Sequence, residues 1–171
     1  KQKRRPTPSK VARPVASNEG AIKQEDLLPG QRVSVDHFIC HTKGRLYTSK
    51  GKTQPESMFS GGCMFVDHAS GAVHVEHQVS LTTHETLQSK HRYEEKARDC
   101  GVIVQNYLSD NGTAFSSADF AKDLARFRQT TNFAGVGAHH HNGVAERAIQ
   151  TIMSMARTMM LHAAIHWPDA A

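Results

Sequence analysis

The sequence contains few cysteines and no long apolar run, and both absences exclude classes of protein. Its three cysteines, Cys40, Cys63 and Cys100, are widely spaced and form no Cys-x-x-Cys pair. A disulfide framework or a structural zinc site is therefore not expected. No stretch approaches the roughly 20 apolar residues that a membrane span requires, and residues 1–14 lack the apolar segment of a secretory signal. We expect an intracellular protein with no membrane partner.

Histidine is common, but its distribution does not indicate a metal site. Of the twelve histidines, only His139, His140 and His141 stand together. No cysteine pair lies where a mixed Cys and His zinc site would need one. The pattern favours solvated loop histidines over a dedicated metal site.

The chain is basic, with a formal net charge of +5 and a sequence pI near 9.3. This charge favours a polyanionic partner such as nucleic acid. Six of the cations lie in a segment rich in Pro, Ser and Ala: Lys1, Lys3, Arg4, Arg5, Lys10 and Arg13. We interpret residues 1–28 as a basic flexible arm or linker, which either tracks phosphates, acts as a nuclear address or is simply solvated. Residues 29–171 are enough for one folded domain.

Alternating and continuous apolar segments predict a mixed sheet flanked by helices. The expected strands cover residues 32–36, 62–67, 72–79, 102–110 and 131–134, and the expected helices cover residues 82–99, 117–127 and 142 onward. The short segment 69–71 suits a hairpin between the second and third strands. Residues 41–60 are polar and basic and are expected to form a long connection. The fourth strand is almost continuously apolar, which is typical of a strand buried on both faces.

The expected helix boundaries carry capping signals. Thr82 followed by Glu85 fits a capping box, in which the two side chains bond the free amides of the first turn, and Gly101 is expected to end that helix. Ser117 and Asn142 are the expected caps of the next two helices. The last helix has an apolar stripe that is expected to bury against the sheet: Val144, Ala148, Ile152, Met155 and Met159.

Three carboxylates occupy strand and helix ends. Asp36 is expected late in the first strand, facing away from Val33 and Val35. Asp110 ends the fourth strand and Glu146 lies in the first turn of the last helix. Open sheets of this class bind ligands beyond the carboxyl ends of their strands. If the three acids converge there they repel one another, and hard divalent cations such as Mg²⁺ relieve that repulsion.

Two segments around these acids carry a family resemblance. Residues 109–115 (SDNGTAF) and 142–147 (NGVAER) closely resemble the two signatures of the integrase catalytic core of retroviruses and copia-like retrotransposons. Thirty-five residues separate Asp110 from Glu146, which is the characteristic separation in that family. Val35-Asp36 is similar to the segment of the family's first catalytic aspartate, and residues 65–70 are similar to the second-strand segment that follows it. The resemblance covers residues 27–171.

The resemblance implies a ribonuclease-H-like α/β fold with a mixed five-stranded sheet flanked by helices. It implies two Mg²⁺ ions, or Mn²⁺ as a substitute: Asp36 would bridge both ions, Asp110 would hold one and Glu146 the other. The implied activity is DNA integration by a polynucleotidyl transferase and endonuclease. Water trims the 3′ end of the element DNA, and the freed hydroxyl then attacks target DNA. Asp67, another acid near a strand end, is implied to be a turn residue rather than a metal ligand.

The resemblance also implies partners and context. The partners are DNA, both element ends and target, and further copies of the chain, with no small-molecule substrate. The chain is expected to be a fragment of a larger polyprotein that acts in the nucleus or in virus-like particles. The expected DNA-contacting residues are Asn111, His141, Asn142, Arg147, Lys43 and Arg45.

The sequence departs from copia-like relatives on both sides of the second signature. Residues 138–141 (AHHH) stand where a proline and glutamines are usual, and residues 148–150 (AIQ) where a basic or amide-bearing run is usual. Fewer cations on this helix face should weaken phosphate binding. Three functions therefore stay open: an integrase, a ribonuclease-H-like nuclease or transposase, and a catalytically silent, domesticated DNA-binding domain.

Overall fold

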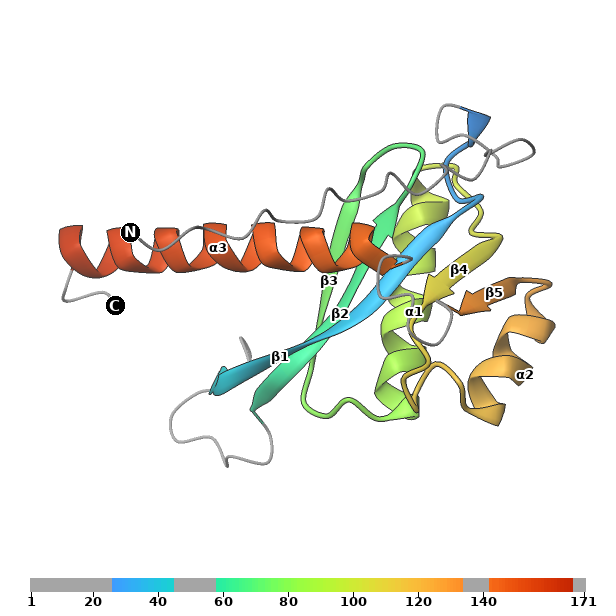
Figure 1. The fold of residues 1–171 in the computed structure, drawn as a ribbon, viewed down its shortest axis with the longest axis horizontal. Coiled ribbons are helices and arrows are strands. Elements are labelled where there is room, and N and C mark those ends of the chain that lie inside the picture. Colours follow the sequence, from blue (N-terminus) through green and yellow to red (C-terminus); the bar gives the residue numbers. More distant parts are fainter. Residues whose placement is uncertain (1–25, 45–57, 134–141, 168–171) are drawn as a thin grey trace, which may run out of the picture.

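The structure, a computed structural model, describes residues 26–44, 58–133 and 142–167. The described part of the chain forms five strands and three helices (Figure 1). In chain order these are β1 (Val33–Gly44), β2 (Phe59–Asp67), β3 (Val73–Gln78), α1 (Thr83–Asp99), β4 (Asn106–Ser109), α2 (Ala118–Arg126), β5 (Thr130–Phe133) and α3 (Gly143–His166).

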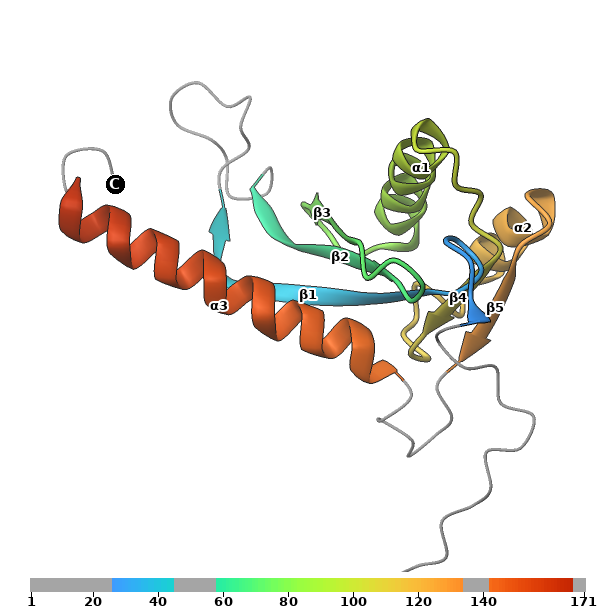
Figure 2. The same ribbon diagram turned by 90° about the horizontal axis from the view of Figure 1, so that it is seen from above.

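The five strands form one mixed sheet in the order β3-β2-β1-β4-β5. The first three strands are antiparallel neighbours, with β1 paired to β2 and β2 to β3, as the predicted hairpin requires. The β1 strand pairs in parallel with β4, and β4 pairs in parallel with β5. Figure 2 shows α1 and α2 on one face of this sheet and α3 on the other. The predicted fold class, a mixed five-stranded sheet flanked by helices, is confirmed.

The main hydrophobic core lies between the sheet and the α1 and α2 helices. Its members on β1 and β2 are every second residue, because successive strand residues point to opposite faces. They are Val33, Val35, Cys63, Phe65, Tyr93, Val104, Tyr107, Phe115, Phe120 and Leu124. Since Val33 and Val35 face this core, Asp36 faces the side of the sheet that α3 covers, as the alternation predicted.

The β1 strand is longer than its sequence pattern predicts. It continues to Gly44, so Asp36 lies early in the strand rather than late, and part of the expected connection 41–60 is strand. Residues 41–44 are exposed and polar, so no apolar alternation signals them. Backbone pairing with β2 holds this extension, with an irregularity in register between Ile39 and Gly44.

The fourth strand is shorter than predicted and is not buried on both faces. It covers only Asn106–Ser109, where burial alternates. Residues 102–105 are not strand, and the Ile103 side chain is 71% exposed. The reason is a local contact with the loop before β1: the Gln105 N–H donates to the Gly30 carbonyl at 2.8 Å. Gly30 has φ +84, and a Cβ there would lie 2.3 Å from the Ile103 carbonyl oxygen, so only glycine fits this approach.

The α1 helix has the predicted bounds, but only half of the capping box forms. The Thr82 hydroxyl accepts a hydrogen bond from the Glu85 N–H at 3.5 Å. The Glu85 carboxylate does not return to Thr82; it accepts from the Val79 and Ser80 N–H groups at 2.8 and 3.1 Å. Glu85 therefore ties the end of β3 to the helix start. In α2, Ser117 caps as predicted, accepting from the Phe120 N–H.

Two predictions about α3 are wrong: its cap and the burial of its apolar stripe. Asn142 makes no side-chain capping bond. The apolar stripe is only half-buried at Ala148 and Ile152 and is exposed at Val144, Met155 and Met159. The main contacts of α3 are with β1 and β2, and its distal half projects beyond them (Figures 1 and 2). Its 24 residues span about 36 Å at 1.5 Å per residue, which exceeds the strip of sheet beneath it. Met159, for example, is 68% exposed. Despite its apolar residues, α3 does not qualify as a membrane span, and neither does any other helix in the described part of the chain.

Candidate active site

Two of the candidate catalytic carboxylates come from neighbouring parallel strands. In the β1–β4 pair, Ser34 lies opposite Leu108. Continuing this register by two residues places Asp36 beside Asp110, which directly follows the end of β4. Asp36 is partly buried and Asp110 is exposed. The fold therefore brings together two acids that are far apart in the sequence, at the end of β4 and next to the middle strand of the sheet.

The third candidate, Glu146, is placed by a bond between α3 and β1. The buried Asn142 side chain, 2% exposed, donates through Nδ2 to the Val35 carbonyl at 3.2 Å. Ala145 is fully buried one turn along, and Glu146 is exposed in the first turn of the helix. The helix start is thus fixed on the face of β1 that carries Asp36. The side chain that was expected to cap α3 instead anchors it.

The pKa of Asp36 depends on its burial and on the two other candidate carboxylates. Burial raises the pKa of the Asp36 carboxyl to about 6; the charges of Asp110 and Glu146 raise it further, while the His37 N–H, which donates to Asp36 Oδ1 at 2.8 Å, lowers it. Among the described residues, the charged groups that raise the Asp36 pKa are two carboxylates, Asp110 and Glu146. Like charges disfavour ionisation, and a bound cation would relieve this repulsion.

The three side chains do not form a closed metal site as they stand. Among the residues that the structure describes, no three acidic, histidine or cysteine side chains are close enough to hold a metal ion. Asp110 is engaged in its own turn, where Oδ1 accepts from the Gly112 N–H at 3.0 Å. The donor set nevertheless fits a hard cation, since Mg²⁺ prefers carboxylate oxygens and keeps several waters. Binding would require the three carboxylates to come closer together.

His37 is a neighbouring residue that the sequence analysis did not identify. Its ring stacks on Phe115 with centroids 4.6 Å apart, and its Nε2 lies 3.0 Å from the Thr86 hydroxyl. Burial lowers the His37 pKa, against the charge of Asp110. His37 therefore connects β1, the segment after Asp110 and the start of α1. The available signal was a polar residue on the strand face that Val33 and Val35 assign to the core.

The structure distributes the expected DNA-contacting residues unevenly. Lys43, Asn111 and Arg147 are exposed. Asn142 is buried, so in this arrangement its side chain serves the contact between α3 and β1. Arg45 and His141 lie outside the described residues. The DNA role of all six stays a prediction.

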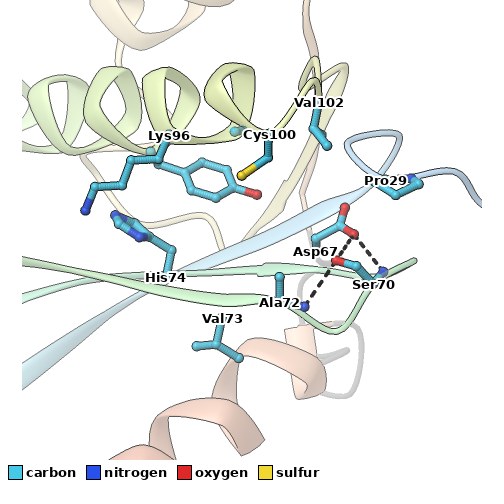
Figure 3. A pocket seen from close by; sticks show the side chains of 11 residues that line it. Pro29, Asp67, Ser70, Ala72, Val73, His74, Lys96, Cys100 and Val102 are labelled. Atoms are coloured by element: carbon cyan, nitrogen blue, oxygen red, sulfur yellow. Dashed lines mark hydrogen bonds between the residues drawn. The ribbon is translucent and has the colours of Figure 1, made fainter.

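Asp67 belongs to a turn and to a separate pocket. Its Oδ1 accepts from the Gly30 N–H at 2.8 Å. Its Oδ2 accepts from the Ser70 N–H and hydroxyl at 2.8 and 2.6 Å, and Figure 3 shows Asp67 and Ser70 side by side. The adjacent cavity has a volume of about 360 Å³ and lies between α1 and the β2–β3 turn. Its lining includes Pro29, Ala72, Val73, Lys96 and Cys100 (Figure 3). None of the three candidate carboxylates lines it, so this cavity is distinct from the candidate active site.

Solved structures of retroviral integrases are similar to this chain. The HTLV-2 integrase catalytic core domain in complex with magnesium matches in its trimeric form at 21% identity and TM-score 0.58, covering 80% of this chain and 75% of that one. The dimeric form matches at 20% identity and TM-score 0.58, covering 84% and 81%. The simian T-cell lymphotropic virus intasome in complex with PP2A regulatory subunit B56 gamma matches at 19% identity and TM-score 0.57, covering 83% and 44%.

No protein-family model and no curated protein matches this sequence. The structural likeness, at about one identical residue in five, concerns the backbone arrangement. The chain therefore has the ribonuclease-H-like fold of retroviral integrase catalytic cores.

Proposed function

We propose that this chain is the catalytic core of a retrotransposon-type integrase, which joins DNA ends by metal-dependent phosphoryl transfer. The observation that carries the proposal is the placement of Asp36 beside Asp110 through the β1–β4 pairing, with Glu146 in the first turn of α3 on the same side of the sheet. The charges of Asp110 and Glu146 both raise the pKa of Asp36. Carboxylates held near one another repel, and a bound divalent cation relieves that repulsion. The fold of integrase cores and the two signature segments support the same assignment.

The proposed cofactor is a pair of Mg²⁺ ions, for which Mn²⁺ can substitute. Asp36 would contact both ions, Asp110 one from the end of β4, and Glu146 the other from the first turn of α3. When bound, such ions stabilise the attacking and leaving oxygens of an in-line phosphoryl displacement. The chain itself contributes the positioning: Asn142 holds α3 on β1, and the β1–β4 pairing holds the two aspartates side by side. The HTLV-2 cores contain magnesium, which supports this choice of metal.

The proposed partners are element DNA ends, target DNA and further copies of the chain. The HTLV-2 cores are described in dimeric and trimeric forms, and the simian virus protein forms an intasome, which supports an oligomer. Residues 1–28, with their six cations, would add contacts to phosphates as a basic arm. A nuclear or particle-bound location follows from this proposal.

A strand-transfer assay tests the function. The protein is incubated with supercoiled plasmid, labelled duplexes with randomised ends, and Mg²⁺ or Mn²⁺. We expect label to join the plasmid with the parent chain, and joining to fall to background in Asp110→Asn and Glu146→Gln, because each loses a charged metal ligand with little change in shape. Asp119→Asn is the matched control, since Asp119 is an exposed acid on α2.

The outcomes separate a DNA-joining enzyme from a plain nuclease and from a silent binding domain. Joining that depends on Asp110 and Glu146 supports the integrase. Plasmid nicking without joining would assign a nuclease, and neither nicking nor joining, together with DNA retention, would assign a silent binding domain. Joining at the parent rate in both variants would overturn the assignment of the site.

A further inference from the structure

Two histidines form a pair at the distal end of α3. His162 and His166 are four residues apart, so they lie one helical turn apart on the same side of the helix. Their ring centroids are 4.2 Å apart, and both side chains are exposed. In the sequence only His139 to His141 stand next to one another; the helix brings this second pair together.

The surroundings leave both imidazoles available. Within the described residues, neither ring takes part in a hydrogen bond or an ion pair; their ring contacts are with each other and with Trp167. Between residues 148 and 166, Arg157 is the one side chain with a full formal charge. No carboxylate of this part of the helix therefore competes for the rings or would draw a hard cation to them.

The pair is far from the candidate active site. Glu146 lies in the first turn of the same helix, and His162 comes sixteen positions later. At 1.5 Å per residue this corresponds to about 24 Å along the axis. An ion held by the histidines would therefore not be one of the ions proposed for the carboxylates.

The donor chemistry selects a class of metal. Two histidines at i and i+4 on one helix face are an arrangement that binds zinc. Imidazole nitrogens suit Zn²⁺, Cu²⁺ and Ni²⁺, whereas Mg²⁺ takes oxygen ligands. His166 also lies in the last turn of α3, where the partial negative charge of the C-terminal helix end favours a cation.

We propose that His162 and His166 form a two-histidine chelate site for a borderline divalent ion of the Zn²⁺ and Cu²⁺ class. Water, or a donor from a bound partner, completes the coordination. The site is independent of the proposed function, because it uses neither the carboxylates nor DNA. The two ends of α3 would then bind metals of different chemical hardness.

Trp167 provides a local reporter for the test. It is the single tryptophan of the chain, and its ring centroid lies 5.7 Å from that of His162 and 6.0 Å from that of His166. We expect Cu²⁺, added alone to the full chain, to quench tryptophan fluorescence saturably with one ion per chain. Excess Zn²⁺ should reverse the quenching, and millimolar Mg²⁺ should not.

Matched variants separate this site from the other histidines. His162→Gln and His166→Gln should each raise the Cu²⁺ concentration for half-quenching about a hundredfold, because each removes the second arm of a chelate. His84→Gln, at an exposed histidine of α1, and the combined variant His139→Gln, His140→Gln, His141→Gln should quench like the parent. The proposal is overturned if His162→Gln/His166→Gln keeps saturable quenching at the parent concentration, or if the combined variant abolishes it.

Discussion

At the scale of single residues, Asp36 combines a candidate catalytic role with an unfavourable position. Its folded pKa of about 6 lies above the ordinary value of 3.8, mainly because of burial. The folded state therefore opposes ionisation of this carboxyl. The penalty is complete above pH 6 and disappears as the pH falls to about 4, where both the folded and the unfolded chain are protonated.

Asp36→Asn should therefore stabilise the metal-free protein near neutral pH while it abolishes joining. A shift of about two units corresponds to about 3 kcal/mol, and partial solvent screening reduces the expected gain to about 1 to 2 kcal/mol. The asparagine Oδ1 can still accept from the His37 N–H. Urea unfolding at pH 7.5 and pH 4 measures the effect. An Asp36→Asn variant that is less stable at pH 7.5, or equally stabilised at pH 4, would contradict this account.

Lys90 is a buried cation whose removal should be costly. It is 1% exposed, and its ammonium lies 2.9 Å from Glu94 and 2.7 Å from Asp123. Burial alone would raise the Asp123 pKa, but hydrogen bonds from Lys90 and His91 lower it overall. Replacing Lys90 leaves two acids without their cation.

We predict that Lys90→Met lowers the free energy of unfolding by about 3 to 5 kcal/mol, as for other broken buried pairs. Lys122→Met is the control, because its pair with Asp119 is exposed and 3.5 Å long and should be worth less than about 1 kcal/mol. Chemical denaturation of both variants at pH 7 decides. Equal losses of unfolding free energy in the two variants would show that the ion pairs of Lys90 with Glu94 and Asp123 do not hold α1 to α2.

Some residue roles were readable from the sequence and others were not. Strand alternation predicted the face of Asp36 correctly, because period-two geometry is local. Asn142 was predicted as a helix cap, yet it bonds to Val35, more than a hundred positions earlier in the chain. The link from His37 to Phe115 and Thr86 was missed for the same reason. Contacts between distant segments leave no local pattern.

At the scale of elements, the middle of the sheet depends on a close approach at Gly62. A Cβ there would lie 2.1 Å from the Glu76 carbonyl oxygen and 2.7 Å from the Phe38 ring. The β2 backbone therefore has no room for a side chain between β3 and Phe38.

Gly62→Ala should destabilise the protein by about 1 to 3 kcal/mol, the usual range for overpacking. Gly143→Ala, in the first turn of α3, meets nothing within 4 Å and should be neutral or stabilising by up to about 1 kcal/mol. Thermal unfolding of the two variants compares them directly. The close approach is refuted if both alanines are tolerated equally.

The distal half of α3 should open more readily than its start. Met155, Met159, Met160, Leu161 and Ile165 are all more than half exposed, so little packing supports this part of the helix. A helical segment of about twelve residues is only marginally stable in water without packing against the rest of the protein. We expect backbone amides of residues 155–166 to exchange with solvent at least about tenfold faster than those of residues 143–150. Uniform protection along α3 in hydrogen exchange would show that another surface covers the distal half.

Element predictions succeeded where a periodic signal and a cap coincide, as in α1 and α2. They failed at β1 and β4 for opposite reasons. The extension of β1 is held by pairing with β2 and carries polar residues, whereas the apolar run before β4 bonds to the Gly30 loop instead of a strand. The apolar stripe of α3 was real, but periodicity cannot show how much sheet is available to cover it.

At the scale of the whole molecule, the sheet order explains why acids from distant segments lie in one region. The parallel β1–β4 pair aligns Asp36 with Asp110, and α3 returns across the opposite face from α1 to bring Glu146 to the same region (Figure 2). The mixed sheet and its flanking helices were predictable from the order of elements together with the family resemblance. The separation of the three side chains was not, because it depends on side-chain torsions that a bound cation would change.

The most direct test of the central claim is the anomalous scattering of Mn²⁺ in crystals of the parent chain at neutral pH. We predict two neighbouring Mn²⁺ peaks, with oxygens of Asp36, Asp110 and Glu146 all in contact with them. Peaks that leave out any one of these carboxylates, or no peak near β1 at saturating Mn²⁺, would contradict the account.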